Sequence, residues 1–341
     1  MELTKIYLIK KFKEYYSKTK LYVPSSFEMR EWAFVPLKNF PEFLMVRHIS
    51  FSDQNELRDF VLSNVPAHVY YSSAYYLKPS AEMDEKGWSG ADLIFDIDYD
   101  HLPTKSLKSA KREVFKLVKI LEKDFGVNEK DLEICFSGNR GYHVHVYDER
   151  FRYLDTMERR EIVDYFTLRG FKLKGRQFER VCNLIYRYLL NAFRDGRIVK
   201  MVQDEKILSF LKDNLREIRY GNIDVIPQPL RDELLNKCLK RLAVHIDPPV
   251  TADVKRLIRL PNSLHGKTGF KVTLIDLDDL DEFDPTRDAL AFGDDPVKVR
   301  VLKKVSVDIG GERYILERGR HTLPENVAIF LMCRGVAHYG H

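Results

Sequence analysis

The segment Leu93-Ile94-Phe95-Asp96-Ile97-Asp98-Tyr99-Asp100 alternates apolar and acidic residues, which is the two-residue period of a β-strand. Residues i and i+2 of a strand are only about 6.6 Å apart, so Asp96 and Asp98 leave the same face of a rigid element. Carboxylates this close repel each other unless something compensates their charge. Mg²⁺ held by oxygen ligands beside a phosphate substrate is the commonest compensation. A solvated face at a sheet edge is the alternative explanation.

Length and composition indicate a folded protein of about two domains. The 341 residues are 44% hydrophobic and 31% charged, and the formal net charge is +5. This mild positive charge is compatible with a polyanionic partner but is too small to establish one. No apolar run approaches the roughly 20 residues that span a bilayer, and the N-terminus lacks a signal-peptide pattern. We therefore expect a soluble, intracellular protein with no membrane partner.

Strand and helix patterns alternate through residues 1–154, which are expected to form the N-terminal part of the core. An amphipathic helix is expected over residues 4–20, and Ser52 is expected to cap a second helix. A third helix over residues 106–125 has an apolar side, and Gly126 ends it. Strands interleaved with helices around one sheet indicate an α+β or mixed α/β fold.

Residues 155–245 are expected to form a mainly helical subdomain, either inserted into the sheet or docked on it. Asp155-Thr156-Met157-Glu158 is a capping box that opens a helix, and apolar residues at helical spacing follow. The later helices are expected near 176–194, 203–219 and 229–243. The many Lys and Arg residues of this stretch are either a solvated face or a surface that contacts a template.

Residues 246–341 return to mixed structure and are expected to complete the core. Their pattern predicts a hairpin of strands 299–307 and 312–316. It also predicts a buried helix over residues 325–333 that ends at Gly335.

The segment Ser137-Gly138-Asn139-Arg140-Gly141-Tyr142-His143 is expected to join two strands through a glycine-flanked turn. Glycines permit backbone shapes that bring N–H groups close to an anion, and Ser137 and Arg140 add donors. The planar fork of Arg suits phosphate, so the turn is a candidate triphosphate site. A tight hairpin with an exposed Arg explains it equally well. His143 and His145 also resemble a two-histidine metal site, but without a third soft ligand phosphate contact is preferred.

A basic segment after the helical subdomain provides a second candidate anion site. Thr251 is expected to cap a short helix in which Lys255 and Arg259 share one side. This pattern suits an anion clamp, although an ordinary basic amphipathic helix shares it. Asp247 or Asp253 is available as a third carboxylate. Because Asp253 would lie in the first turn and complement the helix dipole, Asp247 is the better candidate for a metal ligand.

Taken together, these segments resemble the small catalytic subunit of the DNA primases of archaea and eukaryotes. The matching motifs are Arg30-Glu31-Trp32-Ala33-Phe34, Arg47-His48-Ile49-Ser50-Phe51, Phe95-Asp96-Ile97-Asp98, Ser137 to His143, and Arg259 to His265. Asp247 precedes His265 by 18 residues, the interval that the family has between its third catalytic aspartate and its nucleotide-binding histidine. The motifs follow the family order over nearly the whole chain, which is far more specific than D-x-D alone.

The resemblance implies a primase-type catalytic core on a central sheet with an appended helical subdomain. It implies a nucleotidyltransferase that makes short RNA or DNA primers from nucleoside triphosphates on single-stranded DNA at replication sites. Asp96, Asp98 and Asp247 would hold two Mg²⁺ or Mn²⁺ ions. The implied nucleotide-binding residues are Ser137, Asn139, Arg140, His143, Lys255, Arg259, His265 and Arg47. A large primase subunit would complete a heterodimer by docking on apolar surface of the helical or C-terminal segments.

The chain departs from the family pattern in two places. Family members usually carry a Cys/His zinc module soon after the D-x-D strand, whereas here a helix follows almost directly. The cysteines, at positions 135, 182, 238 and 333, form no C-x-x-C pair, so the sequence does not support structural zinc. Asn139 also stands where some relatives carry Arg, which leaves one positive group fewer at the phosphates.

Three other functions use similar motifs. A metal-dependent D-x-D phosphatase of the haloacid-dehalogenase type expects Thr or Val two places after the second Asp, where this chain has Asp100. Another nucleotide-using transferase, such as a sugar-nucleotide glycosyltransferase, would not need residues 137–143 and 259–265. A non-catalytic nucleic-acid-binding subunit would tolerate loss of the carboxylates, and all three are present.

Overall fold

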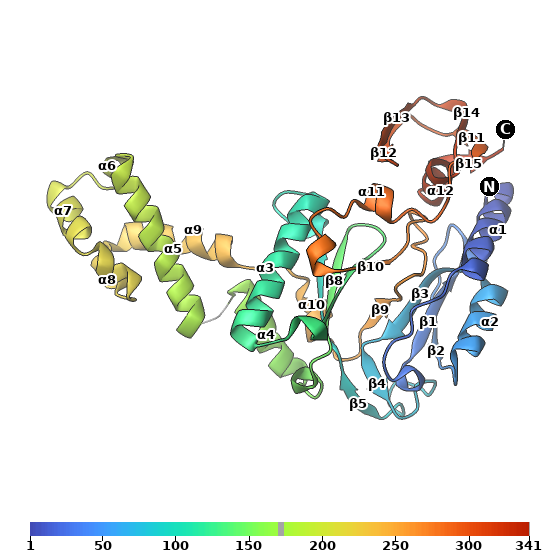
Figure 1. Ribbon diagram of the computed structural model, residues 1–341, viewed down its shortest axis with the longest axis horizontal. Coiled ribbons are helices and arrows are strands. Elements are labelled where there is room, and N and C mark those ends of the chain that lie inside the picture. The colour runs from blue at the N-terminus through green and yellow to red at the C-terminus, as the bar shows by residue number, and fades with distance from the viewer. Residues whose placement is uncertain (170–173, 341) are drawn as a thin grey trace. The chain divides into compact units, whose positions relative to one another are not determined.

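The computed structural model describes residues 1–169 and 174–340, and the chain divides into two compact units (Figure 1). The first, here called the sheet unit, contains residues 1–122, 126–160 and 247–341. The second, called the helical unit, contains residues 123–125 and 161–246. The sheet unit is therefore built from segments that lie on both sides of the helical unit in the sequence.

Two four-stranded sheets form the centre of the sheet unit, so the expected single central sheet is in fact a pair. The first has the order β2-β1-β3-β9 and consists of β1 (Trp32–Pro36), β2 (Val46–Ile49), β3 (Pro66–Ser72) and β9 (Leu257–Arg259). The second has the order β10-β7-β8-β6 and consists of β6 (Leu93–Asp98), β7 (Leu132–Phe136), β8 (Gly141–Val146) and β10 (Thr273–Ile275). Neighbouring strands in both sheets are antiparallel, and helices flank them, which confirms the α+β class.

Strand β6 has the two-faced character that its sequence indicates. Leu93, Phe95 and Ile97 are fully buried, whereas Asp96 and Asp98 on the opposite face are partly exposed. The strand lies at the edge of its sheet and pairs only with β8 among the named strands. Its acidic face is therefore partly open to solvent, and its second edge is not paired with a named strand.

The helices of the sheet unit are α1 (Glu2–Lys18), α2 (Gln54–Asn64), α3 (Leu107–Phe125, whose last turn belongs to the helical unit), α10 (Pro248–Ala252), α11 (Pro285–Asp288) and α12 (Glu325–Cys333). Helix α3 begins and ends as predicted, because Ser106 accepts a hydrogen bond from the Ser109 N–H and Gly126 is left-handed. The predicted cap of α2 is wrong. Asp53 caps it by accepting from two backbone N–H groups, and Ser52 lies one residue outside the helix.

A small three-stranded sheet, β14-β11-β15, closes the C-terminal part. Its strands are β11 (Pro296–Val301), β14 (Gly319–Pro324) and β15 (Ala337–Tyr339). The predicted strand 299–307 is wrong, because the exposed residues 302–304 separate β11 from β12 (Val305–Ile309). Strand β12 instead pairs with β13 (Glu312–Leu316) in a separate hairpin. A further pair, β4 (Ala74–Tyr76) and β5 (Trp88–Ala91), lies between β3 and β6 in the sequence.

The predicted helix with Lys255 and Arg259 on one side is also wrong. Helix α10 ends at Ala252, and Leu257–Arg259 forms β9, which pairs with Tyr70, Tyr71 and Ser72 of β3. Strand β3 offers unpaired backbone groups along its second edge, and satisfying them outweighs a local preference for helix. The two basic side chains therefore share no helix face.

The helical unit is described by itself. Helix α4 (Thr156–Thr167) leads into it and begins with the predicted capping box, in which Asp155 and Glu158 exchange hydrogen bonds. Its other helices are α5 (Gly175–Arg194), α6 (Ile198–Met201), α7 (Glu205–Asp213), α8 (Leu215–Arg219) and α9 (Gln228–Leu242). The predicted helix 203–219 is therefore two helices with a break at Asn214. Apolar residues of α5 and α9 pack in one cluster.

No helix within residues 1–169 and 174–340 combines the length and the hydropathy needed to span a bilayer.

Candidate active site

Three carboxylates from distant parts of the sequence meet at the open face of β6. Asp96 and Asp98 come from β6 itself, and Asp247 immediately precedes α10. The Asp247 N–H donates a hydrogen bond of 2.8 Å to the Asp96 carbonyl, which fixes the start of α10 against the strand. Asp247 is therefore the aspartate that joins the pair.

The electrostatics around Asp96 are unfavourable for a negative charge. Its side chain is 18% exposed, and its Oδ1 atom is buried without a hydrogen-bond partner in the described structure. Burial, together with the charges of Asp98 and Asp247, raises the pKa of Asp96 to about 7. The nearest cationic candidate is His143 Nε2, 3.8 Å from Oδ1. Burial holds the pKa of His143 well below its usual value, so that ring is neutral and does not compensate the carboxylate.

Asp98 has a different partner in this structure. Arg140 donates to its Oδ2 at 3.1 Å and to Asp100 Oδ2 at 2.5 Å. Within the described residues, no three His, Cys, Asp or Glu side chains already converge as ligands of one ion. An ion that binds Asp98 through Oδ2 therefore has to compete with Arg140 for that oxygen.

The turn between β7 and β8 holds the Asp98 side of the site. The Ser137 Oγ accepts a 3.3 Å hydrogen bond from the Gly141 N–H, and the Ser137 N–H donates to the Gly141 carbonyl, so Ser137 closes the turn. A Cβ atom on Gly141 would lie 2.2 Å from the Ile97 carbonyl oxygen and 2.5 Å from Asp98 Oδ1. Only glycine lets the turn approach β6 this closely.

The same turn packs against the segment that contains His265. Gly138 has a φ of +83°, and a Cβ atom there would lie 2.7 Å from the His265 Cβ. The Thr268 hydroxyl donates a 2.6 Å hydrogen bond to the Gly138 carbonyl and lies 3.4 Å from His265 Nδ1. Burial, with a smaller effect of the Arg259 charge, lowers the pKa of His265 well below its usual value. His265 is therefore a neutral ring that fixes the turn.

A pocket of about 420 Å³ opens beside Asp96 and is rich in cations. It is lined by Met45, Arg47, Tyr70, Asp96, His143, Val250, Asp253, Lys255, Arg256, Leu257, Ile258 and Arg259. Five predicted site residues therefore share it: Asp96, His143, Arg47, Lys255 and Arg259. The predicted ligands Ser137, Asn139, Arg140 and His265 lie outside its lining. Two larger cavities, of about 910 and 630 Å³, touch none of the three clustered aspartates.

Two of the pocket arginines are held by groups that the sequence reasoning did not identify. Arg47 donates to both oxygens of the buried Glu31, at 3.0 and 3.3 Å. The Arg259 guanidinium lies 5.2 Å from the centre of the Tyr70 ring, and its Nε has no hydrogen-bond partner in the described structure. Both guanidinium groups therefore have fixed positions and unused donors. The R-E-W-A-F motif contains the one sequence signal for this arrangement, which is Glu31.

Three further residues lie beside the predicted ones. Arg256 lines the pocket next to Lys255, and the basic run in the sequence is a signal for it. Arg334 donates a 2.9 Å hydrogen bond to the Asn139 side chain from the end of α12, and Thr268 supports the turn as described above. No local pattern indicates the roles of Arg334 and Thr268, because both depend on contacts between remote segments.

The arrangement is suited to a phosphate ester that binds with a divalent cation. The carboxylates offer oxygen ligands of the kind that Mg²⁺ and Mn²⁺ prefer, and Asp96 Oδ1 is a buried acceptor that lacks a donor. The adjoining wall offers Arg47, Arg256 and Arg259 to phosphate oxygens. A substrate that carries several phosphates next to its reacting centre fits both the carboxylates and the basic wall of the pocket.

Comparison with known proteins gives one consistent result. The family model described as DNA primase small subunit matches residues 95–277. The DNA primase small subunit PriS of Archaeoglobus fulgidus is 48% identical over 353 aligned positions, which cover 99% of each chain. The proteins of the same name from Methanococcoides burtonii and Methanocella arvoryzae are 39% and 38% identical, over 99% and 98% of each chain.

Proposed function

Because the chain belongs to the DNA primase small subunit family, we propose that it joins nucleoside triphosphates into short primers on a single-stranded DNA template. The observation that carries the proposal is the meeting of Asp96, Asp98 and Asp247 beside a pocket lined by four basic side chains. The proposed reaction is nucleotidyl transfer, with pyrophosphate as the leaving group.

Asp96, Asp98 and Asp247 are the residues that would hold Mg²⁺ or Mn²⁺. When bound, such ions lower the pKa of the attacking 3′-hydroxyl and neutralise the charge that develops on the leaving pyrophosphate. Asp96 is only partly ionised near neutral pH because its pKa is about 7. It must release that proton to act as a ligand, so cation affinity rises with pH through this range.

The basic wall of the pocket would hold the triphosphate. Arg259 and Arg47 have planar guanidinium groups that are already positioned, by Tyr70 and Glu31 respectively. Little side-chain freedom is lost when they bind phosphate oxygens, which favours binding. Lys255 is exposed at the rim and adds a less directional positive charge.

Arg140 would couple substrate binding to the carboxylates. Its guanidinium bridges Asp98 and Asp100 in this structure. A triphosphate that replaces Asp98 as the partner of Arg140 leaves the Asp98 carboxylate free to bind a cation. Nucleotide and divalent cation would therefore each favour binding of the other.

The partners follow from the family. The relatives are named as small subunits, and we propose a large primase subunit as the second chain of a heterodimer. The template is single-stranded DNA.

Asp→Ala variants at residues 96 and 247 test the proposal, with Asp253→Ala as the matched comparison from the same pocket. Primer synthesis on single-stranded DNA with Mn²⁺ is expected to vanish for Asp96→Ala and Asp247→Ala and to persist for Asp253→Ala. Calorimetric titration of each chain with Mn²⁺ alone should show the same order of loss. Primer extension by the Asp96→Ala variant at the parent rate is incompatible with the proposed role of the carboxylates.

A further inference from the structure

The three-stranded C-terminal sheet has one apolar face and one basic face. On β11, Val297, Val299 and Val301 are buried, and α12 contacts the sheet. The alternating residues Lys298 and Arg300 are exposed on the other face. The apolar face explains why the sheet folds, whereas the basic face needs a separate explanation.

Positive charges stand directly opposite one another on that face. Arg300 on β11 pairs across the strands with Arg320 on β14 and with His338 on β15. Like charges in directly opposed positions destabilise a sheet. The pKa of His338 is lowered by burial and further by the α-amino group of Met1 and by Arg300, so another cationic group lies close by. The arrangement therefore carries an electrostatic cost.

No ion pair in the described part of the chain, residues 1–169 and 174–340, offsets that cost. No carboxylate there lies within 4.0 Å of the charged groups of Lys298, Arg300, Lys303 or Arg320. The neighbouring β12–β13 hairpin is different. There Arg313 pairs with Asp308 at 2.7 Å and Lys304 pairs with Glu317 at 2.5 Å. Uncompensated charge on one face, beside paired charge on the next element, is typical of a surface that receives an external anion.

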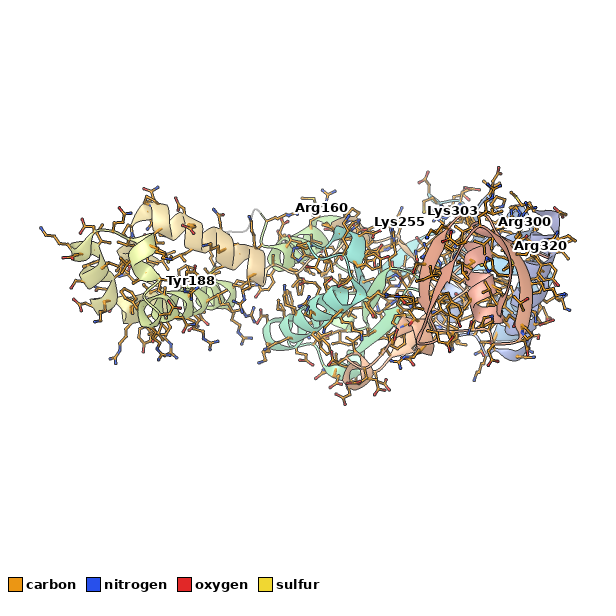
Figure 2. All side chains as sticks on the ribbon, turned by 90° about the horizontal axis from the view of Figure 1, so that it is seen from above. Arg160, Tyr188, Lys255, Arg300, Lys303 and Arg320 are labelled. Atoms are coloured by element: carbon orange, nitrogen blue, oxygen red, sulfur yellow. The ribbon has the colours of Figure 1, made fainter. Side chains whose placement is uncertain are left out.

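Several of these cations are gathered on the C-terminal sheet. Arg300 and Arg320 are directly opposed on β11 and β14, and Lys303 follows β11 in the loop 302–304. Figure 2 labels all three over this sheet. Such a group of cations suits a chain of phosphates better than a single small anion.

We propose that the exposed face of β11 and β14 together with the loop that follows β11, here called the basic face and formed by Lys298, Arg300, Lys303 and Arg320, binds the phosphate backbone of single-stranded template DNA. The proposal rests on the proposed function and adds to it a contact surface for the template on the C-terminal sheet. Tyr339, an exposed aromatic residue on the neighbouring strand β15, is stacked on Tyr7 with ring centres 4.1 Å apart and is not free to stack on bases. Contacts would therefore be made to phosphates and would be independent of base sequence.

The double variant Arg300→Gln/Arg320→Gln tests the proposal in the full-length chain, with Arg313→Gln as the matched control. Binding of a fluorescent single-stranded DNA oligonucleotide is measured by anisotropy over a series of salt concentrations, without nucleotides. The loss of two phosphate contacts should reduce the slope of log K against log salt by about 1.4, which lowers affinity about 25-fold at 0.1 M salt relative to 1 M. Arg313→Gln should leave the slope unchanged.

A second readout separates binding from folding. Because the double variant removes a like-charge pair, its thermal stability should equal or exceed that of the parent chain. Unchanged affinity and slope in a stable double variant would overturn the proposal and would leave an acidic protein surface as the partner of this face. If the parent chain binds no single-stranded DNA but still makes primers, the proposed contact on the basic face is wrong and the proposed function stands. If Asp96→Ala still makes primers, the proposed function is the part that fails.

Discussion

Asp96→Asn is expected to abolish nucleotide addition and, at the same time, to stabilise the metal-free protein in a pH-dependent way. The change keeps the shape of the side chain but removes a charge that is buried next to Asp98 and Asp247. In the folded chain, the pKa of Asp96 is raised from 3.8 to about 7. Between these values the folded state holds a proton that the unfolded chain has released. Stability of the parent therefore falls as the pH rises through this window.

The size of the effect follows from the two pKa values. The two pKa values differ by about 3 units, and each unit corresponds to about 1.36 kcal/mol. The folded parent is therefore destabilised by about 4 kcal/mol once the pH exceeds both pKa values, as at pH 8. At pH 5, where Asp96 of the folded protein still holds its proton, the same relation gives a destabilisation of about 2 kcal/mol. Asp96→Asn is not subject to this penalty, so its advantage over the parent should grow by about 2–3 kcal/mol from pH 5 to pH 8.

Urea unfolding in the presence of a chelator measures this difference. The two tryptophans, Trp32 and Trp88, both belong to the sheet unit, so their fluorescence reports its unfolding. Asp308→Asn is the control, because Arg313 lowers the pKa of Asp308 below its usual value. Its carboxylate is then ionised in the folded and the unfolded chain at both pH values, so the stability difference between this variant and the parent should be the same at pH 5 and pH 8. Added Mg²⁺ should stabilise the parent and not Asp96→Asn. An advantage of Asp96→Asn that is equal at pH 5 and pH 8 would refute the reasoning.

Three further changes have defined outcomes. Gly141→Ala places a Cβ atom 2.5 Å from Asp98 Oδ1 and should reduce primer synthesis about 100-fold, measured at saturating nucleotide, because Asp98 is displaced. Glu31→Gln weakens the hold on Arg47 and should raise the KM for nucleotides about tenfold with little change in kcat; equal loss in both would argue against a positioning role. Asp124→Asn removes the bidentate acceptor of an arginine in the helical unit and should destabilise that unit by about 1–3 kcal/mol in far-ultraviolet circular dichroism melts, while kcat stays at the parent value.

The parts of the fold that sequence predicted correctly are those that depend on near neighbours. Strand β6 is recognisable because its alternation lies within six residues, and α3 because Ser106 and Gly126 mark its ends. The class of the fold follows from such elements in order. The error at the start of α2 is of the same local kind, since Ser52 and Asp53 are adjacent capping residues and only the geometry selects between them.

Strand β9 shows why the remainder could not be predicted. Residues 254–259 have apolar spacing that fits a helix, but residues 257–259 form a strand because β3, far away in the sequence, has a free edge. The break between β11 and β12 has a similar cause, since β11 pairs with β14 whereas β12 pairs with β13. Pairing partners are a property of the folded chain and leave no mark in a local window.

The candidate site divides in the same way. Residues such as Asp96 and Arg259 can be recognised in the sequence because they belong to motifs, and the family spacing singles out Asp247. The groups that hold them in place are not visible, because Glu31, next to β1, bonds Arg47 on the neighbouring strand β2, and Arg334 bonds Asn139 from the end of the last helix. Sequence indicates which side chains are present, whereas their unused donors and raised pKa depend on burial.

The hydrogen bond between the Asp247 N–H and the Asp96 carbonyl has a consequence for protein synthesis. Asp247 leaves the ribosome only after the whole helical unit has been translated, on the order of ten seconds after Asp96. During that interval the nascent polypeptide contains Asp96 and Asp98 but not yet Asp247. Under the proposed role of the three aspartates, an emerging chain would add no nucleotides before Asp247 is in place, and a prematurely terminated product that ends before Asp247 would be inactive.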